Sequence, residues 1–280
     1  GNITYMGTVV CRGNVEDGFS IKADGNIEIY GSVGNCHIEA GGDIVISQGV
    51  MGRDEGEIIT SKSVWARFLQ NVKVTAEEYV VVNDNIMNSN VTAMKKILLK
   101  GKRASIIGGH LFATEEITAK NIGSSGGGIE TILEVGFDPK AKLRLQELQE
   151  MQSNVVKQLE EVDLNISTLE NQKKVRRSLP KEKEETLANL RNQRVDLMDS
   201  SEKMTTEINE INAHNRELKV VGCVNASGTV YPGAKILVRD EIDEIRSECK
   251  AVTFYFDNGF VKRKKYEPTQ DSNEMEKPDG

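Results

Sequence analysis

Apolar and polar positions alternate with a period of two through residues 1–135, and this alternation restarts about every 17 residues. Such alternation is typical of short β-strands that bury one face. The predicted strands begin at Ile27, Ile44, Val64, Val80, Ile97 and Ile117. A second element closes each repeat on a small residue, and these residues are Ala23, Ala40, Ser61, Ala76, Ala93 and Ala113.

Stacking of the repeats explains this pattern, because a unit of two or three very short strands cannot bury its apolar face alone. The small closing residues fit a tight corner, and the pair Gly41-Gly42 supplies a turn. A left-handed solenoid of the hexapeptide type needs a strict six-residue period. The spacing here varies, so the sequence favours the alternative, a right-handed parallel β-helix with loops of variable length.

The pattern changes at Asp138-Pro139, where Asp is a good helix N-cap and Pro suits the first helical position. Residues 139–218 contain no glycine and carry an apolar heptad pattern. The first predicted helix places Leu145, Leu148, Gln152, Val155, Leu159, Val162, Ile166 and Leu169 on one seam. The second places Leu187, Leu190, Arg194, Leu197, Ser201, Met204, Ile208 and Ile211 on the facing seam.

The two seams are symmetric about residue 178, beside Pro180, where a turn is expected. Folding the chain there pairs Leu169 with Leu187, although it also sets Arg194 against Val162. We therefore expect a long antiparallel coiled-coil hairpin that interrupts the solenoid, with arms of about 60 Å for about 40 residues. The polar seam positions are interpreted as register-setting or tolerated defects.

The strand pattern resumes after the helices. Residues 219–262 are predicted to form a final solenoid turn and a capping hairpin that turns at Asp257-Asn258-Gly259. The polar residues 263–280 are predicted to be disordered. The expected domains are the β-helix 1–137, the coiled-coil hairpin 138–218, the final turn and cap 219–262, and the tail 263–280.

The net charge of −7 excludes an overall basic surface, so a nucleic-acid site would need a local patch. The four cysteines form no CxxC pair and the three histidines have no metal-ligand spacing, so we expect reduced thiols, no metal and no cofactor. No apolar run reaches the length of about 18 residues that a membrane span needs. The chain starts at Gly1 without a Met, and we expect it to be an excised fragment of a longer protein.

Several stretches together resemble the bacterial flagellar assembly protein A family. They are residues 127–139, residues 228–234, and the alternation of Ile27-Glu-Ile-Tyr-Gly31 with Ile38-Glu-Ala-Gly-Gly42. The order of solenoid, coiled coil and solenoid is the specific part of the resemblance, which covers about residues 5–262. The solenoid is also similar to the β-helical domain of the cell-division inhibitor MinC and, more loosely, to bactofilins.

The resemblance implies a cytoplasmic bacterial protein that acts as a non-catalytic scaffold or regulatory binding protein in flagellar assembly and motility. It implies protein partners in the flagellar or polar machinery, and an N-terminal domain of the family that this sequence lacks. The related β-helices self-associate, so a homodimer is expected as well.

Some β-helices cleave polysaccharides with paired carboxylates, so the acidic residues of the strands are the catalytic candidates. Glu115 and Glu116 are adjacent and point to opposite sides of a strand, and Asp84 lies in an Asn-Asp-Asn run typical of turns. The glycine-rich residues 123–128 lack the Lys-Ser/Thr ending of a phosphate loop and do not precede a helix. The sequence therefore predicts that the protein is not an enzyme.

Basic residues are instead gathered in three clusters, which are the candidate partner-binding sites. The tip cluster contains Lys173, Lys174, Arg176, Arg177, Lys181 and Lys183; the turn cluster contains Lys95, Lys96, Lys100, Lys102 and Arg103; the C-terminal cluster contains Lys262, Arg263, Lys264 and Lys265. Such segregation in an acidic protein suggests capture of an acidic partner, although solubility and edge protection are the plainer interpretation. The alternative function is RNA binding in post-transcriptional control of flagellar genes through these basic patches.

Overall fold

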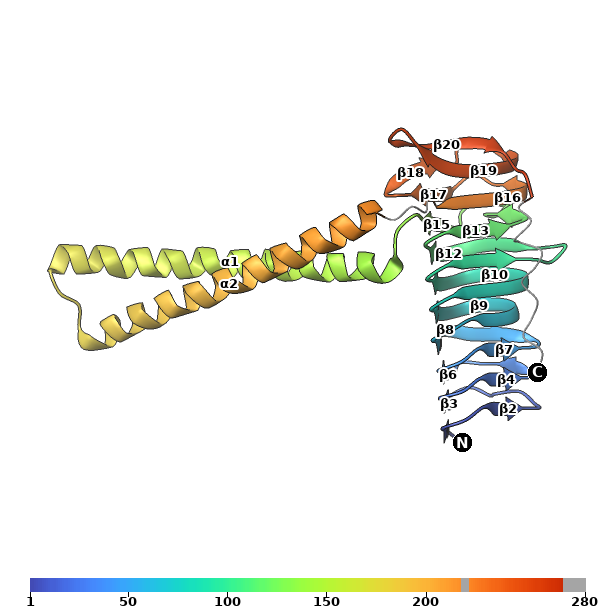
Figure 1. Ribbon diagram of the computed structural model, residues 1–280, viewed down its shortest axis with the longest axis horizontal. Helices are drawn as coiled ribbons and strands as arrows, with labels where there is room; N and C mark the ends of the chain where they lie inside the picture. Colours follow the sequence, from blue (N-terminus) through green and yellow to red (C-terminus); the bar gives the residue numbers. More distant parts are fainter. Residues whose placement is uncertain (218–221, 269–280) are drawn as a thin grey trace. The chain divides into compact units, whose positions relative to one another are not determined.

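The computed structural model describes residues 1–217 and 222–268, and it divides into two compact units (Figure 1). One unit joins Gly1–Pro139 with Lys219–Gly280 and holds the strands; the other is Lys140–Leu218 and holds the helices. All the named strands belong to one continuous sheet, whose successive turns stack from the blue N-terminal strands to the orange and red C-terminal ones (Figure 1).

Three ladders of parallel strands build this β-solenoid. The first ladder consists of β1 (Ile3–Tyr5), β3 (Ser20–Ala23), β6 (His37–Ala40), the last residues of β8 (Gly49–Thr60), β9 (Val64–Ala76), β10 (Tyr79–Ala93) and β12 (Ser105–Ala113), then β15 (Thr131–Val135) and β17 (Ala234–Val238). The second consists of β2 (Val9–Cys11), β4 (Ile27–Ile29), β7 (Ile44–Ile46), the starts of β9 and β10, β11 (Lys96–Leu99), β13 (Glu116–Ala119) and the start of β16 (Cys223–Val230). The third, shorter ladder consists of β5 (Ser32–Val33), the start of β8, the middles of β9 and β10, the start of β12, β14 (Asn121–Ile122) and the end of β16.

The register of the second ladder confirms the predicted repeat, although β10, β11 and β13 each begin one residue earlier than predicted. Ile27, Ile44 and Val64 lie side by side on successive turns, followed by Val80, Ile97 and Ile117. One closing residue was predicted wrongly, because Thr60 and not Ser61 is aligned with Ala40 and Ala76. The Thr60 side chain is buried and its hydroxyl donates to the Gly42 carbonyl, so a hydrogen bond satisfies a polar group at a position where the other turns carry alanine.

Asn and Asp side chains at the corners tie each turn to the next. The Asn14 Oδ1 atom accepts from the Ser32 amide at 2.9 Å, and Asp17 accepts from the Asn35 amide at 2.8 Å in the same way. Such contacts require the backbones of neighbouring turns to approach closely. Gly101 shows the closest approach, since a Cβ built there would lie 1.9 Å from the Asn83 carbonyl oxygen.

Gly101→Ala should therefore push two turns apart and lower the free energy of unfolding by about 1–3 kcal/mol. Gly13→Ala is the matched control, because a Cβ at Gly13 meets nothing within 4 Å. It should change the stability by no more than about 0.5 kcal/mol. Urea unfolding followed by circular dichroism measures both, and equal values for the two variants would contradict the packing argument.

The solenoid continues across the helical segment, because β16 pairs with β13 and β17 pairs with β15. The end of the solenoid is covered by β18 (Glu241–Glu244), β19 (Cys249–Asp257) and β20 (Phe260–Lys265), which add antiparallel strands. The predicted terminal hairpin and its turn are confirmed by the pairing of β19 with β20. Residues 263–265 were predicted to be disordered, and this is wrong because they are the last residues of β20; residues 269–280 lie outside the described part of the chain.

The helical unit contains α1 (Pro139–Arg176) and α2 (Lys181–Glu217). Every predicted seam residue except Arg194 is buried or half-buried. Four buried side chains from both helices and their connection form one cluster, made of Val162, Ile166, Leu179 and Leu187. Ion pairs also join the helices, as between Arg144 and Glu207 at 2.7 Å. Of the helices that the structure describes, neither is apolar enough over a sufficient length to span a membrane.

Candidate functional site

The outward face of the second ladder carries a column of apolar side chains that lies outside the main hydrophobic cluster. Val45, Trp65, Val81 and Leu98 occupy equivalent positions on β7, β9, β10 and β11. Each lies between two inward-facing residues, as Val81 does between Val80 and Val82. We call these four residues the Trp65 column.

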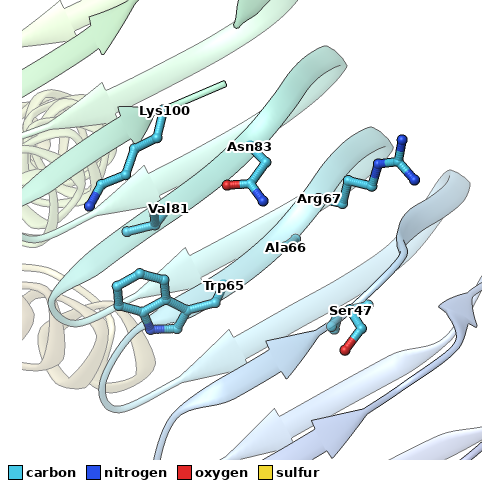
Figure 2. Close-up of a pocket in the computed structure, with 8 residues that line it drawn as sticks. Ser47, Trp65, Ala66, Arg67, Val81, Asn83 and Lys100 are labelled. Carbon is cyan, nitrogen blue, oxygen red and sulfur yellow. The ribbon is translucent and has the colours of Figure 1, made fainter. Parts of the chain in front are cut away.

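A cavity of about 190 Å³ opens beside the Trp65 column (Figure 2). Trp65 and Val81 form its apolar wall, while Arg67, Asn83 and Lys100 contribute polar groups. The Trp65 Nε1–H is buried and has no hydrogen-bond partner among the described residues. An apolar wall with an unsatisfied indole donor is suited to an occupant that brings apolar surface and an oxygen acceptor. Arg67 already pairs with Asp84 at 2.8 Å. We call this cavity the Trp65 groove.

Towards the capped end, the outward column turns polar. Thr118, Asn225 and Thr253 follow Leu98 in register. The Asn225 side chain donates to a Glu116 carboxylate oxygen at 2.8 Å and accepts from the Thr253 hydroxyl at 2.7 Å. These buried polar groups satisfy one another, which indicates a structural network that holds the last turn to the cap.

A second cavity, of about 260 Å³, lies between the apolar and polar parts of the column. Leu98, Lys100, Thr118, Lys120 and Tyr266 contribute to its lining. Lys100 therefore belongs to both cavities, and Tyr266 lies where the chain leaves the cap. Burial, with the nearby Glu116 carboxylate, raises the pKa of the Tyr266 phenol.

Cys223 lies beside this network, and it offers a pH-dependent test of the local burial. Burial, assisted by Glu116, raises the pKa of the Cys223 thiol to about 11. The thiolate is the reactive form, and at pH 8 it amounts to about one molecule in a thousand for such a pKa. We expect alkylation of Cys223 by iodoacetamide to be slow and to accelerate about tenfold per pH unit up to about pH 9.5.

The rate is read from the mass of the Cys223 peptide, with circular dichroism to verify the fold at each pH. Cys11, which is partly exposed in the first turns, is alkylated in the same sample and serves as the internal comparison. A Cys223 rate that levels off near pH 9 would contradict the raised pKa.

The turn cluster is not one basic patch in the structure. Lys95 pairs with Glu78 at 3.0 Å, and Lys96 lies 3.5 Å from Glu116, so acids from neighbouring turns neutralise both. Residues 95–103 contain no acid, but parallel stacking brings the acids of adjacent turns beside them. Lys100, Lys102 and Arg103 are exposed at the corner that follows β11.

The C-terminal cluster is placed on β20 rather than after the last strand. Lys262 pairs with Asp257 at 2.5 Å, and the Arg263 guanidinium makes two hydrogen bonds of 2.7 Å with Asp243. Lys264 lies 5.4 Å from the centre of the Tyr255 ring, and Lys265 is the last residue of the strand. The side chains of Lys262, Arg263 and Lys264 therefore contact other residues of the cap.

The tip cluster lies at the connection between α1 and α2. Lys174, Arg176, Arg177 and Lys181 are exposed. Lys173 pairs with Glu184 at 3.1 Å, and Lys183 donates to Gln172 at 2.9 Å. The tip is therefore the most exposed of the three clusters.

No metal centre emerges from residues 1–217 and 222–268, where no three His, Cys, Asp or Glu side chains gather closely enough to hold an ion. Glu115 and Glu116, which were considered as a carboxylate pair, both lie near Lys96. The outward charges of the first ladder pair between turns as well, so that Lys73 lowers the pKa of Glu57.

The Trp65 column was missed by the sequence reasoning, although a signal for it exists. β4 reads Ile27-Glu28-Ile29, with a polar outward residue, whereas β7, β9, β10 and β11 contain the uninterrupted apolar triplets 44–46, 64–66, 80–82 and 97–99. Strands that are buried on both faces have such continuous runs. The interruption of the alternation therefore marks a covered outward face.

Comparison with protein families agrees with this architecture. The family model described as the Flagellar Assembly Protein A (FapA) beta solenoid domain matches residues 1–261. Comparison with curated proteins and with solved structures found no match. Since the family model spans the three strand ladders and the helical segment, the chain belongs to the flagellar assembly protein A β-solenoid family.

Proposed function

We propose that the protein is a non-catalytic scaffold of bacterial flagellar assembly, acting in the cytoplasm, that binds a protein partner in the Trp65 groove. The family supports the link to flagellar assembly. The observation that carries the binding site is the Trp65 groove itself, where the chain's only Trp lies at an apolar wall with an unpaired indole N–H. Trp is a residue type that often dominates the binding energy of protein interfaces.

The test uses Trp65→Ala in the native host, with Tyr30→Ala as the matched control. Tyr30 is an exposed aromatic residue of the solenoid that lines neither of the two cavities. Trp65→Ala should weaken partner binding about tenfold or more and reduce motility, while Tyr30→Ala should do neither. Crosslinking followed by mass spectrometry identifies the partner, and equal recovery of flagellar components by both variants would contradict the proposal.

The proposed architecture includes a right-handed winding of the solenoid and an antiparallel coiled coil of α1 and α2. Pairs such as Gln152 with Thr205, Asp163 with Arg194 and Glu170 with Arg191 support opposite helix directions, because one residue number rises as the other falls. In this proposal the hairpin is a second binding element, which presents the tip cluster to an acidic surface of the partner.

Self-association and RNA binding stay predictions. The dimer rests on the resemblance to β-helices that self-associate. RNA binding has less support than the sequence suggested, since Lys95, Lys96, Lys262 and Arg263 are paired with acids. Light scattering tests the dimer, and titration of RNA affinity against salt tests the tip, where a steep fall of log affinity with log salt is expected.

A further inference from the structure

One side of the helical unit combines exposed apolar residues with charges of both signs. Arg191 of α2 pairs with Glu170 of α1 at 2.6 Å, so these two residues lie on the same side of the helix pair. A heptad pattern returns to the same side every seven residues. Met198 follows Arg191 by seven residues and Val156 precedes Glu170 by fourteen, so both lie on this side. We call it the Met198 face.

The apolar part of the Met198 face is exposed. Val156 and Met198 have 44% and 49% of their surfaces exposed. Glu160 and Glu202 follow them by four residues, a spacing that makes side chains neighbours on a helix surface. Both acids are exposed and form no ion pair among the residues that the structure describes. An apolar pair beside two unneutralised acids is suited to basic side chains with long apolar stems.

The Met198 face becomes basic towards the tip. The side-chain hydrogen bond from Arg191 lowers the pKa of Glu170, and the charge of Lys174, four residues after Glu170, adds to this effect. Lys174 therefore belongs to the Met198 face, and Lys181 begins α2 at the same end. Both bases are exposed and without an ion pair in the described part of the chain. The fourteen residues from Glu160 to Lys174 separate the acidic end from the basic end by about 21 Å.

We propose that the Met198 face is a dimer interface, on which two copies of the chain lie antiparallel, with the basic tip of each copy on the acids and the apolar pair of the other. The arrangement has two-fold symmetry, so the contact between Lys174 and Glu160 forms twice. A parallel arrangement would set Lys174 against Lys174, which like charges disfavour. The inference rests on the proposed antiparallel pairing of α1 and α2, but it requires neither the Trp65 groove nor a flagellar partner.

The centre of this interface is electrically balanced. Between its two ends lie the pairs Arg191–Glu170 and Arg194–Asp163, each at 2.6 Å. The symmetry axis passes through this region, because it is midway between Lys174 and the acids Glu160 and Glu202. Pairs of opposite charge therefore meet each other there, and no net charge opposes the contact.

The overlap is large enough for a dimer. Gln152 contacts Thr205, which places Glu202 level with residue 155 of α1. The overlap from this level to the tip includes about 22 residues of α1, so it is about 33 Å long, and two adjacent helices are about 20 Å wide. Such a patch measures about 650 Å² on each copy and about 1,300 Å² in total, which is within the range of stable interfaces.

Sedimentation velocity of the full chain tests the interface through an exchange of charges. Lys174→Glu with Lys181→Glu makes the tip acidic, and Glu160→Lys with Glu202→Lys makes the other end basic. Each double variant alone should raise the dissociation constant of the dimer about tenfold or more, because like charges then meet. All four substitutions together restore opposite charges and should return the constant to within about threefold of the parent value.

Two results of this experiment would overturn the inference. One is a parent chain that stays monomeric up to about 100 μM. The other is a dimer that the two double variants leave unchanged, or that the fourfold variant does not restore. Circular dichroism verifies that each variant keeps its helices.

Met198→Glu tests the apolar part of the interface, and Met151→Glu is its matched control. Met151 is 42% exposed and lies on the opposite side of the helix pair, seven residues after Arg144, which pairs with Glu207 there. Met198→Glu should raise the dissociation constant about tenfold, whereas Met151→Glu should leave it unchanged. Equal constants for the two variants would contradict the assignment of the face.

Zero-length crosslinking reports the orientation without any substitution, and it decides the outcome if a variant fails to fold. A carbodiimide joins an amine directly to a carboxylate, and within one copy Lys174 is about 21 Å from Glu160 and farther from Glu202. In a mixture of isotope-labelled and unlabelled chains, we expect links from Lys174 to Glu160 or Glu202 that join one labelled chain to one unlabelled chain. A crosslinked dimer without these links would overturn the inference.

The interface and the proposed function fail separately. If the exchange of charges controls the dimer while Trp65→Ala keeps full partner binding, the interface stands and the groove is not the partner site. If the dimer ignores the exchange while Trp65→Ala weakens partner binding, the interface is wrong and the partner site stands. If both hold, an acidic partner that binds the tip should compete with the second copy, so its addition should dissociate the dimer.

Discussion

Phe254→Ala is expected to lower the free energy of unfolding by about 3–5 kcal/mol, the range for an aromatic residue removed from a core. Phe254 is fully buried on β19, next to Val224 of β16, and thus covers the last turn of the core. Arg263 of β20 pairs with Phe254 across the hairpin, lies 5.4 Å from the centre of its ring and is held by Asp243. Removal of the ring opens a cavity between the cap and the solenoid and frees an apolar edge.

Phe260→Ala is the matched control for this experiment, because Phe260 lies on the same hairpin with 68% of its surface exposed. It should change the stability by no more than about 0.5 kcal/mol. Guanidinium unfolding followed by far-ultraviolet circular dichroism compares the two variants. A loss below about 1 kcal/mol for Phe254→Ala would mean that the cap unfolds independently of the solenoid.

The repeating strands could be predicted from the sequence because every turn must bury an apolar side chain at the same inward position. Ile27, Ile44 and Val64 must each fill the same inward position, so their spacing determines the register. The register at Thr60 was predicted incorrectly because a buried hydroxyl with a backbone acceptor is compatible with a position that otherwise takes alanine. A pattern of apolar residues cannot distinguish the two neighbouring hydroxyl residues at 60 and 61.

The candidate sites were less predictable, because they depend on neighbours that are distant along the chain. Lys96 lies in a stretch, residues 95–103, that contains no acid, yet its ammonium group is 3.9 Å from Glu115 and 3.5 Å from Glu116 of the next turn. The Trp65 groove likewise needs β7, β9, β10 and the corner after β11 to be stacked before it exists. Parallel stacking therefore brings basic residues of one turn beside acids of the next, where they form ion pairs. It also places outward residues of separate turns side by side, and together they form a groove.

Replacing residues 150–206 with a short turn is expected to leave the solenoid as stable as in the parent chain while partner binding falls. The strands on either side pair directly, β13 with β16 and β15 with β17, so the helices are not needed to close the sheet. The shortened chain keeps Leu148 and the Arg144–Glu207 pair at the base of the two helices. A shorter connection also lowers the cost of loop closure, by about 1 kcal/mol at most.

Denaturant unfolding of this variant is followed through Trp65, which lies in the strand unit and does not report on the helices. An unchanged midpoint together with weaker partner binding would place a binding element in the helical segment. A midpoint that falls strongly would contradict the independence of the two units, and the loss of binding would then be a consequence of unfolding.

Charge-reversing substitutions at the tip test whether partner binding depends on the basic residues there or on the length of the helices. Lys174, Arg176 and Arg177 are exposed, and changing all three to Glu leaves the Lys173–Glu184 pair intact. If an acidic partner surface is captured there, the affinity should fall about tenfold and its dependence on salt should weaken, because like charges now face each other. Lys157→Glu with Lys203→Glu reverses two exposed basic residues away from the tip and should keep the parent affinity. If the tip variant binds as tightly as this control while the shortened chain does not, the partner contacts the sides of α1 and α2, and the basic tip serves solubility alone.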